Sequence, residues 1–292
     1  MPITAPAIVR GEDLELRKIT THRGGGRSRK IFGFLDREHG ICLNASMTVY
    51  TRERLNPRHK HDFDQMRFYV HGGENYGTQV FGPGDCVYFP EGVPYGPSFT
   101  AEGHEENVRL NMQFQGPSRG PFFYRTEVQG GEPGLLKIGK FENGLFVWPD
   151  GRKQDSAEAV REYLGGKKIE YPIPRYDDYV VMHSNQYAWQ SLANVKGVSI
   201  KHLGYFNEGG PNIKMVKIDA GACTPAGTAP CQQVRFLIEG QIFYSGERYS
   251  AISCMYFPAR VPYESTVSEN GATLLVVQLV SCEGQRPPFC LV

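Results

Sequence analysis

The sequence predicts an all-β chain made of two tandem jelly-roll β-barrel domains, joined by an aromatic-rich connection that contains a short helix. Short runs rich in Val, Ile, Tyr and Phe, separated by Gly, Pro and Asn, dominate from about residue 30 to 125 and again from about 198 to 282. The runs of the first half return in the second half at a constant offset. A chain of 292 residues with 40% hydrophobic residues can bury two medium cores, and the repeat favours two similar domains over one large one.

The repeat is clearest where Gln65-Met66-Arg67-Phe68 returns as Gln233-Val234-Arg235-Phe236, an offset of 168 residues (233 minus 65). The same offset joins Gly72 to Gly240, Cys86 to Cys254, Tyr88-Phe89-Pro90 to Tyr256-Phe257-Pro258, and Val93-Pro94-Tyr95 to Val261-Pro262-Tyr263. However, His59 and His61 align with Gly227 and Ala229, so only the first copy has imidazoles. What both copies keep is expected to serve the fold, whereas what one copy alone has is the better candidate for function.

The expected elements follow from these runs. In the first half we expect strands over residues 40–50, 66–70, 85–90 and 108–114, and in the second half over residues 212–218, 234–238, 252–258 and 273–279. Each half therefore has the strands of an antiparallel barrel. The expected domains are an N-terminal arm (1–30), a first barrel with the candidate site (31–125), a connection (126–197) and a second, structural barrel (198–292).

One helix is expected, inside the connection. Asp155 and Glu158 form a capping-box pattern, Ala157, Val160 and Leu164 recur at helical spacing, and Gly165-Gly166 ends the run. The connection is also too aromatic to be disordered, since it carries Phe146, Trp148, Tyr171, Tyr176, Tyr179, Tyr187 and Trp189. We expect it to pack on the barrels.

Composition limits the function. The formal net charge is +1 and no long run of like charge occurs, which argues against nucleic acid or an anionic membrane as the partner. The N-terminus lacks the pattern of a signal peptide and no window is apolar enough to span a bilayer, so a cytoplasmic protein is expected. Seven cysteines without a CxxC group argue against a disulfide framework or a zinc knuckle. Cys86 and Cys254 are expected to be buried reduced thiols.

His59 and His61 are the principal candidate site. Residues at i and i+2 of a strand point to the same face, so both imidazoles can be directed into a barrel, with Gln65 shortly after them. Imidazole pairs favour d-block dications. The alternative is a polar loop in which the rings are solvated or bonded to Asp62 or Asp64.

Alternation extends the candidate site along two strands. If Gln65 points inward, Arg67 and Tyr69 point inward too, and a guanidinium can bind a substrate carboxylate through two hydrogen bonds. On a later strand Arg109, Asn111 and Gln113 alternate with apolar residues, as expected for a polar face that lines a barrel. Two alternatives remain open, a structural ion pair for Arg67, which Arg235 repeats, and a solvated polar face for the later strand.

The spacing of these residues resembles a known family. The pattern H-x-H-x3-Q-x6-G from His59 to Gly72, followed by G-x5-P-x-G-x2-Y from Gly84 to Tyr95, resembles the two-part cupin signature. In that signature the place of Gln65 is usually Glu and the place of Tyr95 is usually a third His. With its repeat the chain looks like a bicupin, nearest to the ring-cleaving dioxygenases of the gentisate and hydroxynaphthoate type. That resemblance implies Fe(II) held by histidines and an aromatic hydroxy-acid substrate.

The resulting hypothesis is a metal-dependent dioxygenase that acts in the first barrel on a small aromatic or hydroxy-acid substrate. His59 and His61 would hold one divalent metal, with Fe(II) first and Mn, Ni, Zn, Cu or Co as alternatives, and no organic cofactor is expected. The third ligand stays open among Gln65, Tyr95, His104 and Gln113. Tyr95 and Arg67 are the expected catalytic residues, and the expected substrate contacts are Arg67, Tyr69, Asn111 and Gln113.

Two further hypotheses use the same residues. In one, the barrel is a metal-free isomerase, dehydratase or cyclase with His59 or His61 as general base and Tyr95 as general acid. In the other, it is a non-catalytic protein that binds a small molecule. In each case the partner is a small molecule, and the second barrel is expected to provide scaffold and a dimerisation surface in a homo-oligomer.

Overall fold

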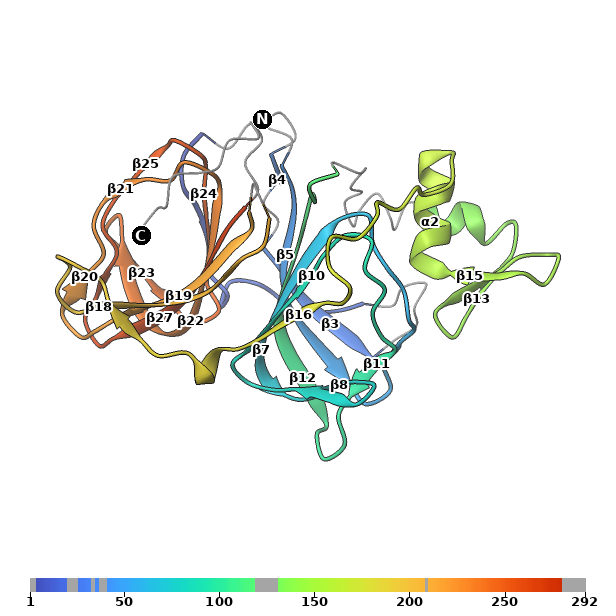
Figure 1. The fold of residues 1–292 in the computed structure, drawn as a ribbon, viewed down its shortest axis with the longest axis horizontal. Helices are drawn as coiled ribbons and strands as arrows, with labels where there is room; N and C mark the ends of the chain where they lie inside the picture. Colours follow the sequence, from blue (N-terminus) through green and yellow to red (C-terminus); the bar gives the residue numbers. More distant parts are fainter. Residues whose placement is uncertain are drawn as a thin grey trace. The chain divides into compact units, whose positions relative to one another are not determined.

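The computed structural model describes residues 4–19, 26–32, 35–36, 41–118, 131–207 and 210–279. The described chain is almost entirely β-structure, which confirms the predicted fold class (Figure 1). It divides into two compact units. Barrel 1 comprises Leu16–Gly33 and Cys42–Met182, and barrel 2 comprises Met1–Glu15, Phe34–Ile41 and His183–Val292.

Barrel 1 is built from two antiparallel sheets. The larger has the strand order β16-β10-β7-β12-β5-β3-β2 and the smaller the order β6-β11-β8-β9. The strands of the larger sheet are β2 (Arg17–Lys18), β3 (Arg27–Ile31), β5 (Ile41–Thr51), β7 (Asp64–Gly72), β10 (Asp85–Phe89), β12 (Glu106–Phe114) and β16 (Val180–His183). Those of the smaller sheet are β6 (Leu55–Asn56), β8 (Glu74–Tyr76), β9 (Gln79–Phe81) and β11 (Ser98–Thr100). A further short strand of the described chain is β4 (Leu35–Asp36).

Barrel 2 repeats this plan. Its main sheet has the order β1-β24-β22-β27-β19-β18-β17, with β20, β23 and β26 joined at its side, and β21 pairs separately with β25. The main strands are β1 (Ala7–Val9), β17 (Gln190–Ser191), β18 (Val198–Tyr205), β19 (Asn212–Ile218), β22 (Gln233–Tyr244), β24 (Cys254–Phe257) and β27 (Ala272–Gln278). The short strands are β20 (Ala222–Cys223), β21 (Gly227–Thr228), β23 (Glu247–Ser250), β25 (Pro262–Tyr263) and β26 (Val267–Ser268), and a 3₁₀ turn, η1, spans Ser184–Gln186.

The predicted strands are confirmed in both halves, with ends that shift by a few residues. β19 has the predicted bounds, whereas β22 runs six residues beyond the predicted run, because its chain continues into a hairpin with β23. The predicted N-terminal arm contributes strands to both units, since β1 pairs with β24 and β3 pairs with β5. Cys86 and Cys254 are free and buried, as predicted, and burial raises the pKa of both thiols.

The two barrels share a backbone irregularity that the repeat explains. Gly72 and Gly240 have φ of +71° and +82°, and a Cβ at these places would lie 2.0 and 2.1 Å from the carbonyl oxygens of Glu106 and Gly271. Only glycine fits there. In each barrel, the strand that contains this glycine shifts its register with its neighbour: β7 with β12 in barrel 1, and β22 with β27 in barrel 2. The repeated glycines therefore serve the fold.

The connection folds as part of barrel 1. Helix α2 (Ser156–Gly165) begins at the N-cap Asp155, which accepts hydrogen bonds from the backbone N–H groups of Ala157 and Glu158, and ends at Gly166 with φ of 64°. The predicted helix is confirmed. Beside it, β13 (Lys140–Glu142), β14 (Leu145–Val147) and β15 (Lys153–Asp155) form a three-stranded sheet that was not predicted, and residues 131–135 are helical.

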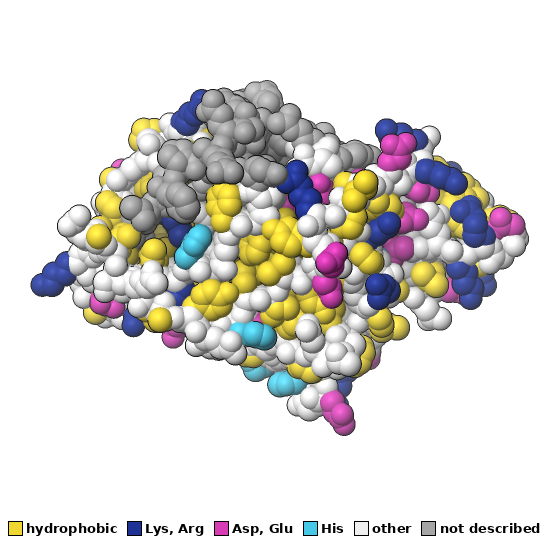
Figure 2. Space-filling view, in the orientation of Figure 1, with side chains coloured by type: hydrophobic (Ala, Val, Ile, Leu, Met, Phe, Trp, Pro, Cys, Tyr) yellow, Lys and Arg dark blue, Asp and Glu magenta, His cyan; other side chains and the backbone are white. Residues whose placement is uncertain are grey.

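Phe146 is fully buried under Val160 and Ala159 of α2. Figure 2 shows basic and acidic side chains intermixed over α2 and β13–β15, without a surface of one sign on this face. Within the described residues, no helix has the length and hydrophobicity needed to cross a bilayer.

Candidate functional site

The histidine segment lies against the loop that ends the cupin-like pattern. His59 forms an isolated antiparallel bridge with Tyr95, through His59 N–H to Tyr95 O (3.0 Å) and Tyr95 N–H to His59 O (2.9 Å). Gly92 N–H donates to the carbonyl of His61 at 2.7 Å. These bonds tie residues 59–61 to the loop from Gly92 to Tyr95, but the segment lies between β6 and β7 and is not part of the strand that was predicted to carry the histidines.

The two imidazoles lie beside each other and beside Tyr95. The ring centroids of His59 and His61 are 4.9 Å apart, and the Tyr95 ring lies 4.5 Å from His59 and 5.7 Å from His61. Nδ1 of His59 lies 2.6 Å from the carbonyl oxygen of Pro57. Because a carbonyl can only accept, Nδ1 donates and the neutral ring carries its lone pair on Nε2. His61 stacks on Phe63 at 4.2 Å.

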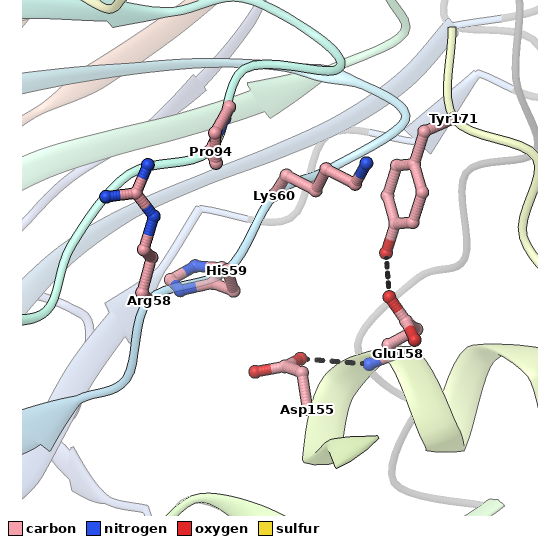
Figure 3. Close-up of a pocket in the computed structure, with 7 residues that line it drawn as sticks. All are labelled: Arg58, His59, Lys60, Pro94, Asp155, Glu158 and Tyr171. Carbon is pink, nitrogen blue, oxygen red and sulfur yellow. Dashed lines mark hydrogen bonds between the residues drawn. The ribbon is translucent and has the colours of Figure 1, made fainter.

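His59 lines a pocket of about 280 Å³ (Figure 3). The residues that line it are Arg58, His59, Lys60, Pro94, Asp155, Glu158 and Tyr171. The wall opposite the histidine segment is the start of α2, where Glu158 accepts a hydrogen bond from the Tyr171 hydroxyl at 2.5 Å. The Lys60 ammonium lies 4.2 Å from the Tyr171 ring. The pocket thus lies between the basic segment Arg58–Lys60, from which His59 lines it, and a wall with the acidic residues Asp155 and Glu158.

A buried ion pair fixes α2 to the histidine segment. Arg161 pairs with Asp62, and the two side chains are 6% and 1% exposed. The Arg161 guanidinium also lies 5.1 Å from the centroid of Phe63, the ring that supports His61. The sequence suggests Asp62 as a partner for the imidazoles. In the structure its partner is an arginine 99 residues later in the chain.

Gln65, Arg67 and Tyr95 form a cluster that both barrels possess. With its oxygen toward Arg67, the Gln65 amide accepts from Nε and Nη2 at 2.8 Å each and from the Tyr95 hydroxyl at 3.3 Å. In barrel 2, Arg235 donates from Nε and Nη2 to Gln233 Oε1 at 3.2 and 3.0 Å. The guanidinium of Arg67 lies over the rings of Phe89 and Tyr95, as that of Arg235 does over Phe257 and Tyr263.

The shared cluster has a consequence for the third metal ligand. The oxygen that Gln65 would offer to a metal is already bonded to Arg67, and the same bond is formed in the barrel without histidines. The Gln113 amide lies 2.8 Å from the Gln65 amide, and Gln113 Oε1 accepts from Asn44 Nδ2 at 3.1 Å. His104 is exposed, directly after a turn. Tyr95 is the remaining candidate that touches both imidazoles.

Deeper in barrel 1 lies a charged layer that barrel 2 lacks. Glu74, on β8 of the smaller sheet, forms an ion pair with Arg109 and accepts from the hydroxyls of Tyr69 (2.6 Å) and Ser98 (2.9 Å). Arg67 Nη1 is 4.0 Å from the same carboxylate. These contacts between the sheets show that the polar faces of β7 and β12 line the interior. Arg109 is 1% exposed, so the solvated-face alternative is wrong.

The equivalent places of barrel 2 are apolar. The offset of 168 residues brings Tyr69 to Leu237 and Glu74 to Ile242. Along β12 the equivalence follows the register, because Gln113 faces Gln65 and Asn44 as Gln278 faces Gln233 and Asn212. Arg109 then corresponds to Leu274 and Asn111 to Val276. All four apolar residues belong to the hydrophobic core of barrel 2.

A second buried acid lies behind the histidine segment. Asp64 accepts from the Tyr88 hydroxyl at 2.6 Å and from the backbone N–H of Glu91 at 2.9 Å. Burial raises its pKa to about 7, against the effect of these hydrogen bonds. Glu91 accepts in turn from the backbone and hydroxyl of Ser118. Asp62 and Asp64, which the sequence offers equally as partners of the imidazoles, thus have different contacts in the structure.

The donors fit an open metal site. His59 and His61 offer two neighbouring imidazoles, and the bond from His59 Nδ1–H to a backbone carbonyl is the usual support of a ligating histidine. Among the described residues, no group of three His, Cys, Asp or Glu side chains could hold a metal ion. The set therefore fits a dication held by two imidazoles, with Tyr95 beside them and further positions left to substrate or water.

No model of a known protein family matches the chain, and no curated protein matches it. Solved structures do. A proposed dioxygenase of Nostoc punctiforme matches with a TM-score of 0.66 and 14% identity, over 96% of this chain and 85% of that one. HEPD of Streptomyces albus, solved with 2-hydroxyethylphosphonate and Fe(II), matches with a TM-score of 0.58 and 12% identity, over 95% and 76%. Oxalate decarboxylase of Bacillus subtilis matches with a TM-score of 0.53 and 15% identity, over 93% and 75%.

These neighbours are cupin-type proteins, and at such low identity the likeness shows the fold alone. The chain has the cupin fold, as the spacing of its motifs predicted. The relation to gentisate-type dioxygenases stays a prediction.

Proposed function

We propose that this chain with the cupin fold is a metal-dependent oxidoreductase of the dioxygenase type, which acts in barrel 1 on a small aromatic or hydroxy-acid substrate. The observation that carries the proposal is the pair of neighbouring imidazoles, of which His59 lines the pocket. It is present in one copy of the repeat only, although the surrounding Gln-Arg-Tyr cluster is present in both. The fold likeness to HEPD, solved with Fe(II), supports the same choice of metal.

In this proposal each residue of the site has a definite task. His59 and His61 would hold the metal, Fe(II) first, and when bound the metal would supply Lewis-acid activation and bring oxygen atoms of two reactants together. Tyr95 lies against both imidazoles and would donate a proton to a reacting oxygen. The buried aromatic rings of Tyr69, Tyr76 and Phe89 give the interior the apolar walls that an aromatic ring would pack on.

The test is metal content and oxygen consumption of untagged protein, prepared anaerobically without added metal. Wild type is expected to hold up to one equivalent of metal after addition of Fe(II), and the His59→Ala, His61→Ala double variant is expected to hold almost none. His71→Ala is the matched control, because His71 is an exposed histidine of the same barrel. O2 consumption with a panel of aromatic hydroxy-acids should follow the metal.

Absence of metal uptake by wild type from Fe(II), Mn(II) and Ni(II) would refute the proposal. Turnover that resists chelators would then support the acid–base alternative, in which Tyr95 and the His59 Nε2 lone pair do the proton transfers. The contact between the His59 and Tyr95 rings favours that alternative, because a neutral imidazole can act as a base and the neighbouring phenol as an acid.

A further inference from the structure

Barrel 1 buries cationic and amide donors that the protein itself does not satisfy. Among the described residues, Nη1 of Arg67, Nε of Arg109 and Nδ2 of Asn111 are buried atoms without a hydrogen-bond partner. Their side chains are 3%, 1% and 3% exposed. A buried polar group without a partner is costly, and a buried charge more so, which is why such groups are rare.

The three side chains belong to one interior patch. Asn111 of β12 is the register partner of Arg67 of β7, and Arg109 lies two residues before Asn111 on the same face. The charge of Arg67 contributes, after burial, to lowering the pKa of Arg109 to about 10. The patch therefore consists of two guanidinium groups and one amide N–H₂ on neighbouring strands of the buried interior.

The only carboxylate described at this patch is already occupied. Glu74 pairs with Arg109 and accepts from the hydroxyls of Tyr69 and Ser98, and Arg67 stands 4.0 Å from it. One carboxylate against two guanidinium groups leaves an excess of one positive charge. The phenol of Tyr50 responds to the same field: burial opposes its ionisation, yet nearby arginines, Arg109 first, lower its pKa well below the usual value.

A comparison with barrel 2 shows which features of this patch are found in barrel 1 alone. Barrel 2 also buries cations, namely Arg235, Lys201 and, in the place of Ser46, Lys214. Charge alone therefore does not distinguish the barrels. The difference is in the cationic donors. Barrel 2 has an amide nitrogen without a partner, Nε2 of Gln233, but no nitrogen of Arg235 or Lys214 is among the described buried atoms without one, and the layer around Arg109 is replaced by Leu and Val.

We propose that Arg67, Arg109 and Asn111 form the binding site for the carboxylate of a small organic acid inside barrel 1. A carboxylate supplies one negative charge and acceptor positions for several donors, which matches the excess charge and the three unpaired nitrogens. That the bound acid is also the substrate rests on the proposed function. The Arg67 guanidinium lies 5.2 Å from the Tyr95 ring, and that ring lies 4.5 Å from the His59 ring. The substrate carboxylate would thus bind one layer behind the imidazoles.

The experiment is calorimetric titration of benzoate, with benzamide as the neutral control of equal shape, into chelator-treated protein at pH 7 and constant ionic strength. Benzoate is expected to bind saturably and at least about 10-fold more tightly than benzamide. The same binding is expected in the His59→Ala, His61→Ala variant. Loss of metal and turnover with retained benzoate binding would refute the proposed function alone; metal-dependent turnover without a benzoate preference would refute this inference alone.

Asn111→Asp is the decisive variant, because it adds a carboxylate, at nearly constant shape, to the patch that holds the two arginines. It should lower benzoate affinity at least about 30-fold and at the same time raise the melting temperature of the ligand-free protein by about 2–4 °C. Asn212→Asp, a buried asparagine of barrel 2, is the matched control and should leave benzoate binding unchanged. A folded Asn111→Asp protein that is less stable than wild type or still binds benzoate fully would overturn the proposal, as would binding of inorganic phosphate but of no carboxylate.

The neutral pair Arg109→Leu, Glu74→Ile introduces the residues of barrel 2 and removes both charges together. This variant should fold, which circular dichroism would verify. Because Arg67 keeps the excess positive charge but the Arg109 donor is lost, benzoate should still be preferred over benzamide and should bind at least about 5-fold more weakly than to wild type. An unchanged benzoate affinity would overturn the assignment of Arg109.

Discussion

Removal of Arg161 should destabilise barrel 1 strongly, because Arg161 is the cation that balances Asp62. Asp62 is 1% exposed, and its Oδ2 atom has no hydrogen-bond partner among the described residues. Removing one member of such a buried pair leaves an uncompensated charge, which costs about 3–5 kcal/mol. We therefore expect Arg161→Met to lower the free energy of unfolding of barrel 1 by that amount. Met keeps part of the packing on Phe63, so the loss of stability arises mainly from the missing charge and less from the missing side-chain volume.

The double variant Asp62→Asn, Arg161→Met separates charge from packing. It buries no ion, so its loss of stability should be only about 1–2 kcal/mol, less than that of the single variant. Equal losses in the single and double variants, or a loss below about 1 kcal/mol in Arg161→Met, would refute the argument.

The two tryptophans of the chain allow each unit to be followed by itself. Trp148 lies in barrel 1 and Trp189 in barrel 2. Urea unfolding followed by Trp148 fluorescence in a Trp189→Phe background should show the loss. Trp189 fluorescence in a Trp148→Phe background should show barrel 2 unchanged.

Three further predictions follow from buried groups and glycines. The pKa of Asp64 is about 7 in the folded state and about 3.9 in the unfolded state, so the folded state binds more protons between these pH values. The free energy of unfolding should therefore fall by about 3–4 kcal/mol as the pH rises from 4 to 7. Urea unfolding at several pH values should show this fall in wild type and a smaller one in Asp64→Asn. Gly72→Ala should cost about 2–4 kcal/mol, and Gly77→Ala, with φ of +61° and no atom within 4 Å of the added Cβ, only about 1 kcal/mol in the same assay. Gln65→Ala should destabilise barrel 1 as much as Gln233→Ala destabilises barrel 2, with unchanged Fe(II) stoichiometry; metal loss confined to Gln65→Ala would show that this amide is a ligand.

The strands and the helix could be predicted because their signals are local. Alternation along β12 and the β-branched run of β19 each occupy one short window, and the cap at Asp155 needs only its own neighbours. The hairpin of β13 and β14 was missed although its signal is local as well. Asn143 and Gly144 have φ of +49° and +79°, the Asn-Gly turn that joins two strands tightly.

The missed parts of the candidate site depend on contacts distant in sequence. Asp62 and Arg161 are 99 residues apart. Glu74 meets Arg109 only because two sheets face each other across the barrel. Hydrophobic periodicity places each residue on a face, but it does not pair one face with another. The pairing of the two histidines was predictable for the opposite reason, because two residues at i and i+2 of an extended segment must lie together.

The comparison of the two barrels indicates whether the charged layer of Glu74 and Arg109 is needed for folding. A buried ion pair contributes little net stability relative to well-packed apolar residues of similar volume, and such a replacement is often neutral or stabilising. Barrel 2 contains that replacement, with Leu237, Ile242 and Leu274 in a closed hydrophobic core on the same strand plan. The cupin framework therefore does not require Arg109 and Glu74 for folding. The charges of barrel 1, together with its imidazoles, are best explained by what the barrel binds.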